Sequence, residues 1–268
     1  MRDPNSFWSQ DELDLTEKYL NQGYLITEVE DRTALKKIQR FVAITTAEYL
    51  GKTVDSEEIF LNDTHRLIRP EKLNPMRLHL MNSMNAQPWF RTQYYSLARN
   101  LLSTIVGNEL AMQLRVNLSI QLPDDSSSLL PVHADVWSGD SPFEAVIWLP
   151  LVACYATKSM FLLPPEPAKR LHNRFSEFQN KSSEEIFKYV EPDLVWLELS
   201  YGEVLLFNQN LPHGNRINEE TETRWSMNCR FKSVFSPYGD KKLGEFFEPI
   251  IIRPATSIGI SYKSPTIE

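Results

Sequence analysis

The segment Met112-Gln-Leu-Arg-Val-Asn-Leu-Ser-Ile-Gln-Leu122 alternates apolar and polar side chains without a break. Because neighbouring side chains of a β-strand point to opposite faces, this pattern predicts a strand with one apolar and one wholly polar face. The segment Arg224-Trp-Ser-Met-Asn-Cys-Arg-Phe231 alternates in the same way. We expect the apolar faces to pack on helices. The polar faces either line the inside of a sandwich, where a ligand would satisfy them, or form an outer face in solvent.

Further short strand-like runs lie around these two segments, at residues 143–152, 159–163, 194–199 and 203–207. Helical patterns are concentrated in the first hundred residues. The predicted fold is mainly β, with N-terminal helices that back a double-stranded β-helix, or jelly roll. We expect a single domain over residues 1–268. Within it, residues 1–108 would give helical support with edge strands, and residues 109–268 would form the jelly-roll core with a helical insertion near 165–191.

The N-terminal helices are marked by residues typical of helix ends. Ser9 and Glu12 form a capping box, and Gly23 can supply the left-handed residue that ends a helix. Asp31 and Gly51 bound a second helix in the same way. The short segment between the two helices is predicted to be an edge strand.

Three other stretches are predicted from weaker patterns. Residues 52–87 are expected to be mostly irregular, as a polar surface excursion or a lid. Residues 88–107 are expected to form one helix that begins at Pro88 and ends at Gly107. Residues 257–262 are expected to form a closing strand.

The composition narrows the class of protein. The chain has 268 residues, of which 42% are hydrophobic, and its net charge is −7, which disfavours binding to nucleic acid or to anionic membranes through bulk charge. The beginning of the chain lacks an apolar leader, and no run approaches the roughly 18 apolar residues of a spanning helix. We therefore expect a cytoplasmic protein. Cys154 and Cys229 are expected to be buried thiols. The sequence predicts no oligomeric state.

The segment Leu130-Pro-Val-His133-Ala-Asp135-Val-Trp137 offers an imidazole and a carboxylate two residues apart. In an extended chain these side chains point to the same side and could share one metal ion. His213, in a Pro-His-Gly turn after a buried strand, is the candidate third ligand. Two imidazoles and one carboxylate form the facial triad that leaves positions open on Fe(II), although the same residues with water could hold catalytic zinc.

Arg224 and Ser226 favour iron over zinc. They follow His213 in the chain, and both lie on the polar face of the next predicted strand. A guanidinium fork beside a hydroxyl at the inner end of a pocket suits the far carboxylate of a small dicarboxylate. A zinc enzyme would have no need for this pair.

In this combination the sequence resembles the Fe(II)/2-oxoglutarate-dependent oxygenases, in particular the phytanoyl-CoA dioxygenase-like branch. The matching pieces cover residues 112 to about 235 and, in order, are His133-Ala-Asp135, Trp148-Leu-Pro-Leu151, Ser159-Met-Phe-Leu-Leu-Pro-Pro165, Gly202-Glu-Val-Leu-Leu-Phe207, Pro212-His213-Gly-Asn and Arg224-x-Ser226. One departure is Pro164-Pro-Glu-Pro-Ala, where the branch often has a Pro-Gly-Ser-His turn. Contacts of the lid and the substrate in that turn are therefore not carried over.

The resemblance implies a cofactor, a cosubstrate and a reaction. His133, Asp135 and His213 would bind Fe(II). The cosubstrate 2-oxoglutarate would chelate the iron while Arg224 and Ser226 hold its distal carboxylate. Its decarboxylation to succinate with O₂ would drive hydroxylation, or another oxidation, of a small-molecule substrate.

A narrower resemblance concerns the substrate. The segments Leu118-Ser-Ile-Gln-Leu-Pro123 and His133-Ala-Asp-Val-Trp-Ser-Gly-Asp-Ser-Pro142 are similar to a bacterial subgroup associated with carbohydrate biosynthesis clusters. This similarity implies a sugar, a nucleotide sugar or a glycan-linked intermediate as the substrate.

Several polar residues are candidates for further contacts. Asn117 and Gln121 either bind the cosubstrate or hydrogen-bond to neighbouring strands. Trp137 and Asp140 are expected to shape the substrate entrance, although Trp137 fits a core position equally well. Arg77, with the charged residues near it, either binds a phosphorylated or carboxylated substrate from a lid or is simply solvated. Arg230 shares a face with Arg224 and is expected to pair with an acid such as Glu144.

Two other classes of function remain open. One is a non-catalytic jelly roll that binds carbohydrate or serves in assembly and has kept the metal residues without turnover. The other is a cupin-like zinc or manganese enzyme such as an epimerase or isomerase. The sequence does not predict the position oxidised or the outcome of the oxidation.

Overall fold

The computed structural model describes residues 7–265 as a mixed α/β structure that is 43% helix and 21% strand. The helices are α1 (Gln10–Gln22), α2 (Arg32–Leu50), α3 (Glu57–Asn62), α4 (Pro70–Asn85), α5 (Phe90–Ser96), α6 (Arg99–Ile105), α7 (Pro165–Asn173), α8 (Ser183–Val190) and α9 (Pro254–Ser261). The strands are β1 (Tyr24–Glu28), β2 (Leu110–Gln113), β3 (Asn117–Gln121), β4 (Glu144–Pro150), β5 (Phe161–Leu162), β6 (Val195–Trp196), β7 (Glu203–Asn208), β8 (His213–Gly214), β9 (Arg224–Ser233) and β10 (Phe247–Ile251). The prediction of a mainly β chain was therefore wrong in its proportions.

Two antiparallel sheets form the β part of the fold. The larger sheet has the order β1-β7-β4-β9-β2-β10, and β3 pairs with β9 beside this path. The smaller sheet has the order β6-β5-β8. A bridge between His133 and His213 adds one residue of the 130–135 segment to the smaller sheet. The expected jelly-roll arrangement of antiparallel strands is present, and the two histidines are joined through their backbones.

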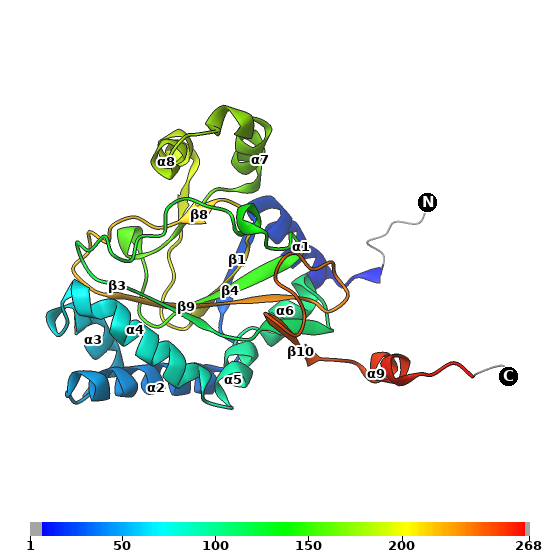
Figure 1. The fold of residues 1–268 in the computed structure, drawn as a ribbon, viewed down its shortest axis with the longest axis horizontal. Helices are drawn as coiled ribbons and strands as arrows, with labels where there is room; N and C mark the ends of the chain where they lie inside the picture. The colour runs from blue at the N-terminus through cyan, green and yellow to red at the C-terminus, as the bar shows by residue number, and fades with distance from the viewer. Residues whose placement is uncertain (1–6, 266–268) are drawn as a thin grey trace.

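The elements are arranged in layers that Figure 1 shows clearly. Helices α2, α3, α4 and α5 lie below the larger sheet, β8 of the smaller sheet lies above it, and α7 and α8 project beyond β8. One hydrophobic core fills the space between the N-terminal helices and the larger sheet, and a second lies between the sheets and under α7 and α8. Strand β4 serves both cores, because Ile147 faces the first and Trp148 the second. A cavity opens beside this second core.

The alternating strands behave as their sequence predicts. On β9, the apolar face is completely buried in the helical core, and it consists of Trp225, Met227, Cys229 and Phe231. Leu118 and Ile120 of β3 belong to the same core. The opposite, polar face of β9 turns toward the space between the sheets, where Arg224, Asn228 and Arg230 line a cavity. The polar faces therefore line the inside of the structure, as the first of the two alternatives predicted.

The predicted helix ends are confirmed. Ser9 and Glu12 form the reciprocal capping box of α1, and Gly23 ends that helix in the left-handed conformation. Asp31 accepts a hydrogen bond from the backbone N–H of Ala34 at the start of α2, and Gly51 ends α2. The insertion between residues 165 and 191 contains α7 and α8, as expected.

The prediction for residues 52–87 was wrong, because most of this segment is helical. Helix α4 begins with Pro70 in its first turn, where the missing N–H leaves no hydrogen bond broken. A second proline, Pro75, lies inside the helix, and it obscured the helical spacing of apolar residues in the sequence. The buried positions nevertheless recur at helical spacing, at Leu73, Met76, Leu80 and Met84.

Three smaller predictions were also wrong. Residues 88–107 form two helices, α5 and α6, because the chain turns between Ser96 and Arg99. The segment 112–122 is divided between β2 and β3, and the side chain of Asn85 binds both backbone groups of Val116 at the break. Residues 257–262 belong mainly to helix α9 and not to a closing strand.

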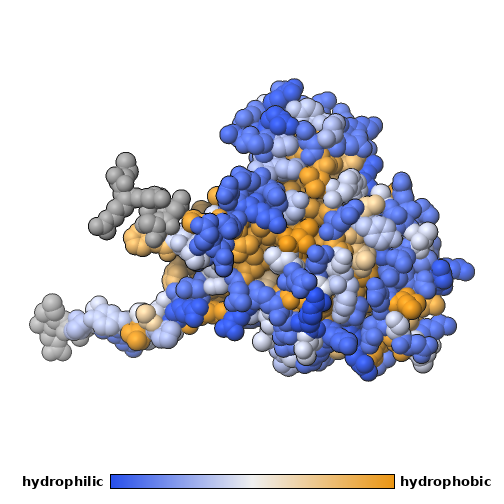
Figure 2. Space-filling model, turned by 180° about the vertical axis from the view of Figure 1, so that it is seen from behind, coloured by the Kyte–Doolittle hydropathy of each residue, from blue (hydrophilic) through white to orange (hydrophobic). Residues whose placement is uncertain are grey.

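Figure 2 shows the molecule from behind, with apolar residues gathered in a hollow beneath the projecting α7–α8 part and hydrophilic residues around it. The C-terminal segment that carries α9 stands away from the body in both views. Among residues 7–265, no helix is long and apolar enough to cross a bilayer. Both cysteines are buried and unpaired, as expected. Residues 1–6, on which part of the expectation of a missing leader rested, lie outside the described residues.

Replacing Gly23 with alanine should destabilise the fold more than the same change at Gly51. Both glycines end a helix with a positive φ, of 79° and 63°, so each alanine would add about 1–2 kcal/mol of left-handed strain. At Gly23 the new Cβ would also overlap Cδ1 of Leu211, whereas nothing lies near Gly51. Overpacking of this kind adds about 1–3 kcal/mol. Urea unfolding of the two variants measures the difference, and equal losses would contradict the packing described here.

Candidate active site

His133, Asp135 and His213 lie together between the two sheets, where each offers one ligand atom within 4.8 Å of the others. His133 Nε2 lies 3.5 Å from Asp135 Oδ1, and the imidazole centroids of the two histidines are 4.4 Å apart. Hydrogen bonds between their backbones, of 3.0 and 2.8 Å, tie the two histidines together. The structure therefore brings the three predicted metal ligands to one point.

Both imidazoles are oriented by carbonyl groups of their own loops. Nδ1 of His133 lies 2.8 Å from the carbonyl oxygen of Pro131, and Nδ1 of His213 lies 2.8 Å from that of Leu211. Since a carbonyl can only accept, each Nδ1 carries the proton and each Nε2 keeps its lone pair for a metal. Gly214 lets the backbone of residues 130–131 lie close to the His213 segment, because a Cβ on residue 214 would lie 2.7 Å from the carbonyl oxygen of Leu130.

Asp135 is held by a charged network on its outer side. Arg230 Nη2 donates to Asp135 Oδ2 at 2.7 Å, which leaves Oδ1 on the side of His133. Nε of Arg230 donates to the amide oxygen of Gln209, whose amide nitrogen donates to Glu144. The expected proximity of Arg230 and Glu144 is confirmed at 3.9 Å. The sequence did not predict the pairing of Arg230 with Asp135.

The protonation states of Asp135 and His213 suit metal binding. Burial alone would raise the pKa of Asp135, but the neighbouring His133 and the charge of Arg230 outweigh it and hold this pKa well below its ordinary value. Burial, reinforced by the neighbouring His133, lowers the pKa of His213 to about 4. At neutral pH the carboxylate is thus ionised and His213 is neutral, which are the forms that bind divalent metals.

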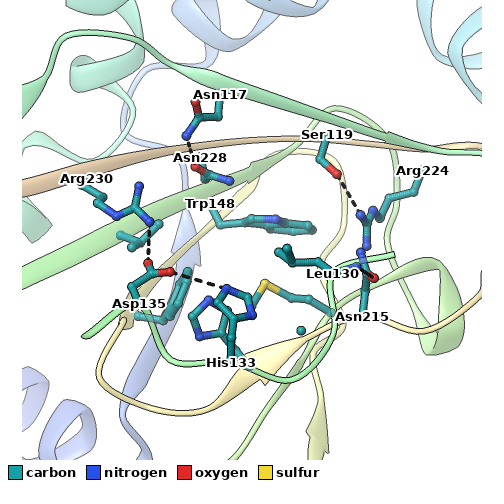
Figure 3. A pocket seen from close by; sticks show the side chains of 15 residues that line it. Asn117, Ser119, Leu130, His133, Asp135, Trp148, Asn215, Arg224, Asn228 and Arg230 are labelled. Atoms are coloured by element: carbon teal, nitrogen blue, oxygen red, sulfur yellow. Dashed lines mark hydrogen bonds and ion pairs between the residues drawn. The ribbon is translucent and has the colours of Figure 1, made fainter. Parts of the chain in front are cut away.

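A cavity of about 840 Å³, counted out to open solvent, begins at the three ligands and continues between the sheets. Figure 3 shows the ligands at one end, Arg224 at the other and Trp148 between them. The apolar part of its wall consists of Leu130, Val146, Trp148, Met160 and Phe207. A mostly apolar wall with a few converging polar groups is the usual form of a small-molecule site.

Arg224 is a buried cation that has no acidic partner among residues 7–265. Its side chain is 3% exposed, and it donates to the carbonyl of Ser159 at 3.0 Å and to the hydroxyl of Ser119 at 2.9 Å. Both acceptors are neutral, and its Nε has no hydrogen-bond partner. Burial lowers the pKa of Arg224 to about 10. A charge in this position is costly unless an anion enters the cavity and neutralises it.

Other unpaired polar atoms lie on the residues around Arg224. The hydroxyls of Ser226 and Ser159 and the amide oxygen of Gln121 are all buried without a partner. In the register of the two strands, Ser226 of β9 lies opposite Ser119 of β3, and Arg224 of β9 lies opposite Gln121 of β3. Buried groups of this kind are rare in proteins unless a ligand or water binds them. The Nε of Arg224 and the two hydroxyls can donate to a carboxylate ligand, so these groups fit one, whereas the amide oxygen of Gln121 can only accept.

The remaining predicted residues have different surroundings. Asn117 lines the cavity and donates to Asn228 on the neighbouring strand at 2.9 Å. Gln121 donates to the backbone of Arg216, and neither it nor Ser226 is part of the cavity wall. Sequence reasoning missed Ser119, Trp148 and Asn228 as lining residues, although Ser119 and Asn228 lie on the polar faces that it identified.

Trp137 and Asp140 lie outside the wall of this cavity. Trp137 packs on Phe175 of the helical insertion at a centroid distance of 4.9 Å, in line with the core reading. Asp140 is 5% exposed and forms an ion pair with Lys241. Arg77 lies on α4 and lines an adjoining groove. His79, a nearby residue of the same helix, stacks on Tyr49.

Comparison with known proteins shows likeness in structure. No family model matches the chain, and no curated protein matches it in sequence. EctD from S. alaskensis, solved with 2-oxoglutarate and 5-hydroxyectoine, matches with a TM-score of 0.56 at 14% identity over 89% of this chain and 80% of EctD. HygX from Streptomyces hygroscopicus, solved with nickel and 2-oxoglutarate, matches with a TM-score of 0.51 at 12% identity over 88% of this chain and 90% of HygX. The non-heme monooxygenase ThoJ, in a nickel complex, matches with a TM-score of 0.52 at 14% identity over 84% of this chain and 79% of ThoJ. The chain therefore has the fold of these three proteins, a double-stranded β-helix.

Proposed function

We propose that this protein is an Fe(II)- and 2-oxoglutarate-dependent oxygenase that acts on a small molecule. The observation that carries the proposal is the placement of two features in one cavity. One is the cluster of His133, Asp135 and His213, and the other is the buried, unpaired guanidinium of Arg224. A metal enzyme without a dicarboxylate cosubstrate would have no use for the second feature.

The donor set favours iron over a structural metal. Among the described residues, the cluster contains three ligands and no cysteine, so an ion bound there keeps positions for a cosubstrate and for dioxygen. HygX, which shares the fold, holds nickel and 2-oxoglutarate, and EctD holds 2-oxoglutarate and a hydroxylated compound. These two structures support the choice of cosubstrate.

Each group of residues has a separate task in the reaction. Fe(II) held by His133, Asp135 and His213 would, with 2-oxoglutarate, supply the oxidant, and the overall reaction would convert 2-oxoglutarate and dioxygen to succinate and CO₂ while the second oxygen atom enters the substrate. Arg230 keeps Asp135 ionised and oriented. Arg224 and Ser119 bind the distal carboxylate of 2-oxoglutarate, with the hydroxyl of Ser226 as a further donor nearby. The apolar wall around Trp148 excludes water from the reacting end.

The identity of the substrate is a separate part of the proposal. The resemblance of the segments around Leu118 and His133 to a carbohydrate-associated subgroup supports a sugar, a nucleotide sugar or a glycan-linked intermediate. Metal, cosubstrate and substrate would then share the cavity between the sheets. We further propose that the enzyme works in the cytoplasm.

The test is formation of succinate by the purified protein in air. We expect succinate when Fe(II) and 2-oxoglutarate are both present, and none when either is omitted. Adding the correct sugar or nucleotide sugar should accelerate the reaction and give a product with one more oxygen atom by mass spectrometry. A protein that forms no succinate and is not stabilised by 2-oxoglutarate would overturn the proposal. Sugar binding that is unchanged by His133→Ala would instead favour a carbohydrate-binding jelly roll.

A further inference from the structure

A second cavity adjoins the active site along strand β3, and we call it the β3 groove. It lies between α4 and the loop before His133, and its wall consists of Pro70, Leu73, Asn74, Arg77, Asn117, Leu118, Ser119, Ile120, Ser127, Ser128, Leu129, Leu130 and Asn228. Asn117, Ser119, Leu130 and Asn228 also line the active-site cavity. The groove and the active-site cavity thus adjoin along a shared stretch of wall.

Strand β3 forms one side of this groove. Among the described strands it pairs only with β9. Leu118 and Ile120 are almost completely buried, so the accessible groups on this side are the polar side chains of Asn117 and Ser119.

Arg77 gives the groove a net positive charge. It is the one ionisable side chain in the wall, which contains no aspartate or glutamate. Its guanidinium donates to the amide oxygen of Asn74 at 2.7 Å and contacts the sulfur of Met81, and within residues 7–265 it forms no ion pair. Asp125, near the far wall, already accepts two hydrogen bonds from Ser127. The positive charge of Arg77 is therefore not compensated within the groove wall.

We propose that the β3 groove binds the substrate through an anionic group, a carboxylate or a phosphate, that contacts Arg77. The body of the substrate then lies beside Leu130 and the Asn117–Asn228 pair, which the groove shares with the active-site cavity. This inference rests on the proposed function and specifies that its substrate is anionic, through a carboxylate or a phosphate. The charge of Arg224 is matched by the cosubstrate, so Arg77 is the guanidinium left for the substrate itself.

The test is an NMR titration of arginine side-chain Nε–Hε signals in the metal-free protein with sodium phosphate and sodium acetate. The signal of Arg77 is assigned by its loss in Arg77→Gln. A sodium chloride titration at equal ionic strength separates binding from screening. We expect a saturable shift of the Arg77 signal at millimolar anion. A shift with phosphate alone would indicate a phosphorylated substrate, and a shift with acetate as well would indicate a carboxylated one. No shift beyond that in chloride, or equal shifts at all exposed arginines, would overturn the proposal.

A matched pair of variants controls for nonspecific charge effects. Lys72 is exposed on the same helix, α4, and is not part of the groove wall. Lys72→Gln and Arg77→Gln remove the same charge, and anion binding to both variants is followed through the backbone amide signal of Ser128 in the groove wall. We expect only Arg77→Gln to weaken this binding, by tenfold or more. Loss of binding in both would mean that the groove acts only through bulk charge and would overturn the role of Arg77. Because the titration needs neither metal nor turnover, its failure is distinct from failure of the oxygenase proposal.

Discussion

Replacing His213 with alanine should abolish metal binding and, with it, all 2-oxoglutarate-dependent formation of succinate. The remaining candidates, His133 and Asp135, lie two residues apart on one segment and would hold an ion from one side only. Loss of groups that merely orient a ligand costs about 10–100-fold in metal affinity, so loss of a ligand itself should cost more than about a hundredfold. Calorimetric titration with Ni(II), the ion bound in HygX, and the succinate assay measure the two effects.

The matched control is His79→Ala. His79 is exposed on α4 and stacks on Tyr49, outside the metal cluster. This variant should keep the metal affinity and the activity of the wild type. If His213→Ala still binds Ni(II) with wild-type affinity, the three residues are not one metal site, and the active-site assignment is wrong.

Much of the sheet could be predicted because its pattern has a short period. Residues of β9 alternate with almost no exception, and burying one face fixes which side each residue takes. The helix ends at Ser9, Gly23 and Asp31 were predictable for a similar reason, since a cap depends on neighbours within three or four residues. These features are local, so the chain alone contains them.

Helices α4 and α9 could not be predicted in the same way. Pro75 lies in the second turn of α4 and removes one backbone hydrogen bond, and the helix forms nonetheless because Leu73, Met76 and Leu80 are buried on one side. The residues of α9 are apolar and β-branched in part, which favours a strand by propensity, yet the segment stands apart from any sheet. In both cases the surroundings decide the structure.

The site shows the same division. His133, Asp135 and His213 could be named because their residue types are chemically specific. The contacts that support them could not. Arg230 reaches Asp135, and Ser119 reaches Arg224, only through the register of β9 against its neighbours. The β3 groove depends on α4, which the sequence did not reveal.

Replacing Arg224 with methionine should remove 2-oxoglutarate binding while leaving the ligand-free protein folded. In the wild type with Ni(II), 2-oxoglutarate at a hundred times its Kd should add about 2.7 kcal/mol of stability. This corresponds to a Tm increase of several degrees for a protein of this size. The increase should vanish in Arg224→Met, because the distal carboxylate loses its charged partner. Thermal unfolding with and without 2-oxoglutarate measures it.

The ligand-free variant provides the decisive comparison, because two opposing effects nearly cancel in it. The methionine leaves the acceptors Ser119 and Ser159 without a donor, at a cost of about 1–3 kcal/mol each if water does not replace it. It also removes a buried cation whose pKa burial has lowered to about 10. A lowered pKa means that the folded state binds this proton less tightly than the unfolded state, so the penalty is present at neutral pH and is relieved only as the pH rises through about 10. We therefore expect a net change below about 2 kcal/mol. A wild-type protein that 2-oxoglutarate does not stabilise, or a variant that it stabilises equally, would show that Arg224 does not bind the cosubstrate.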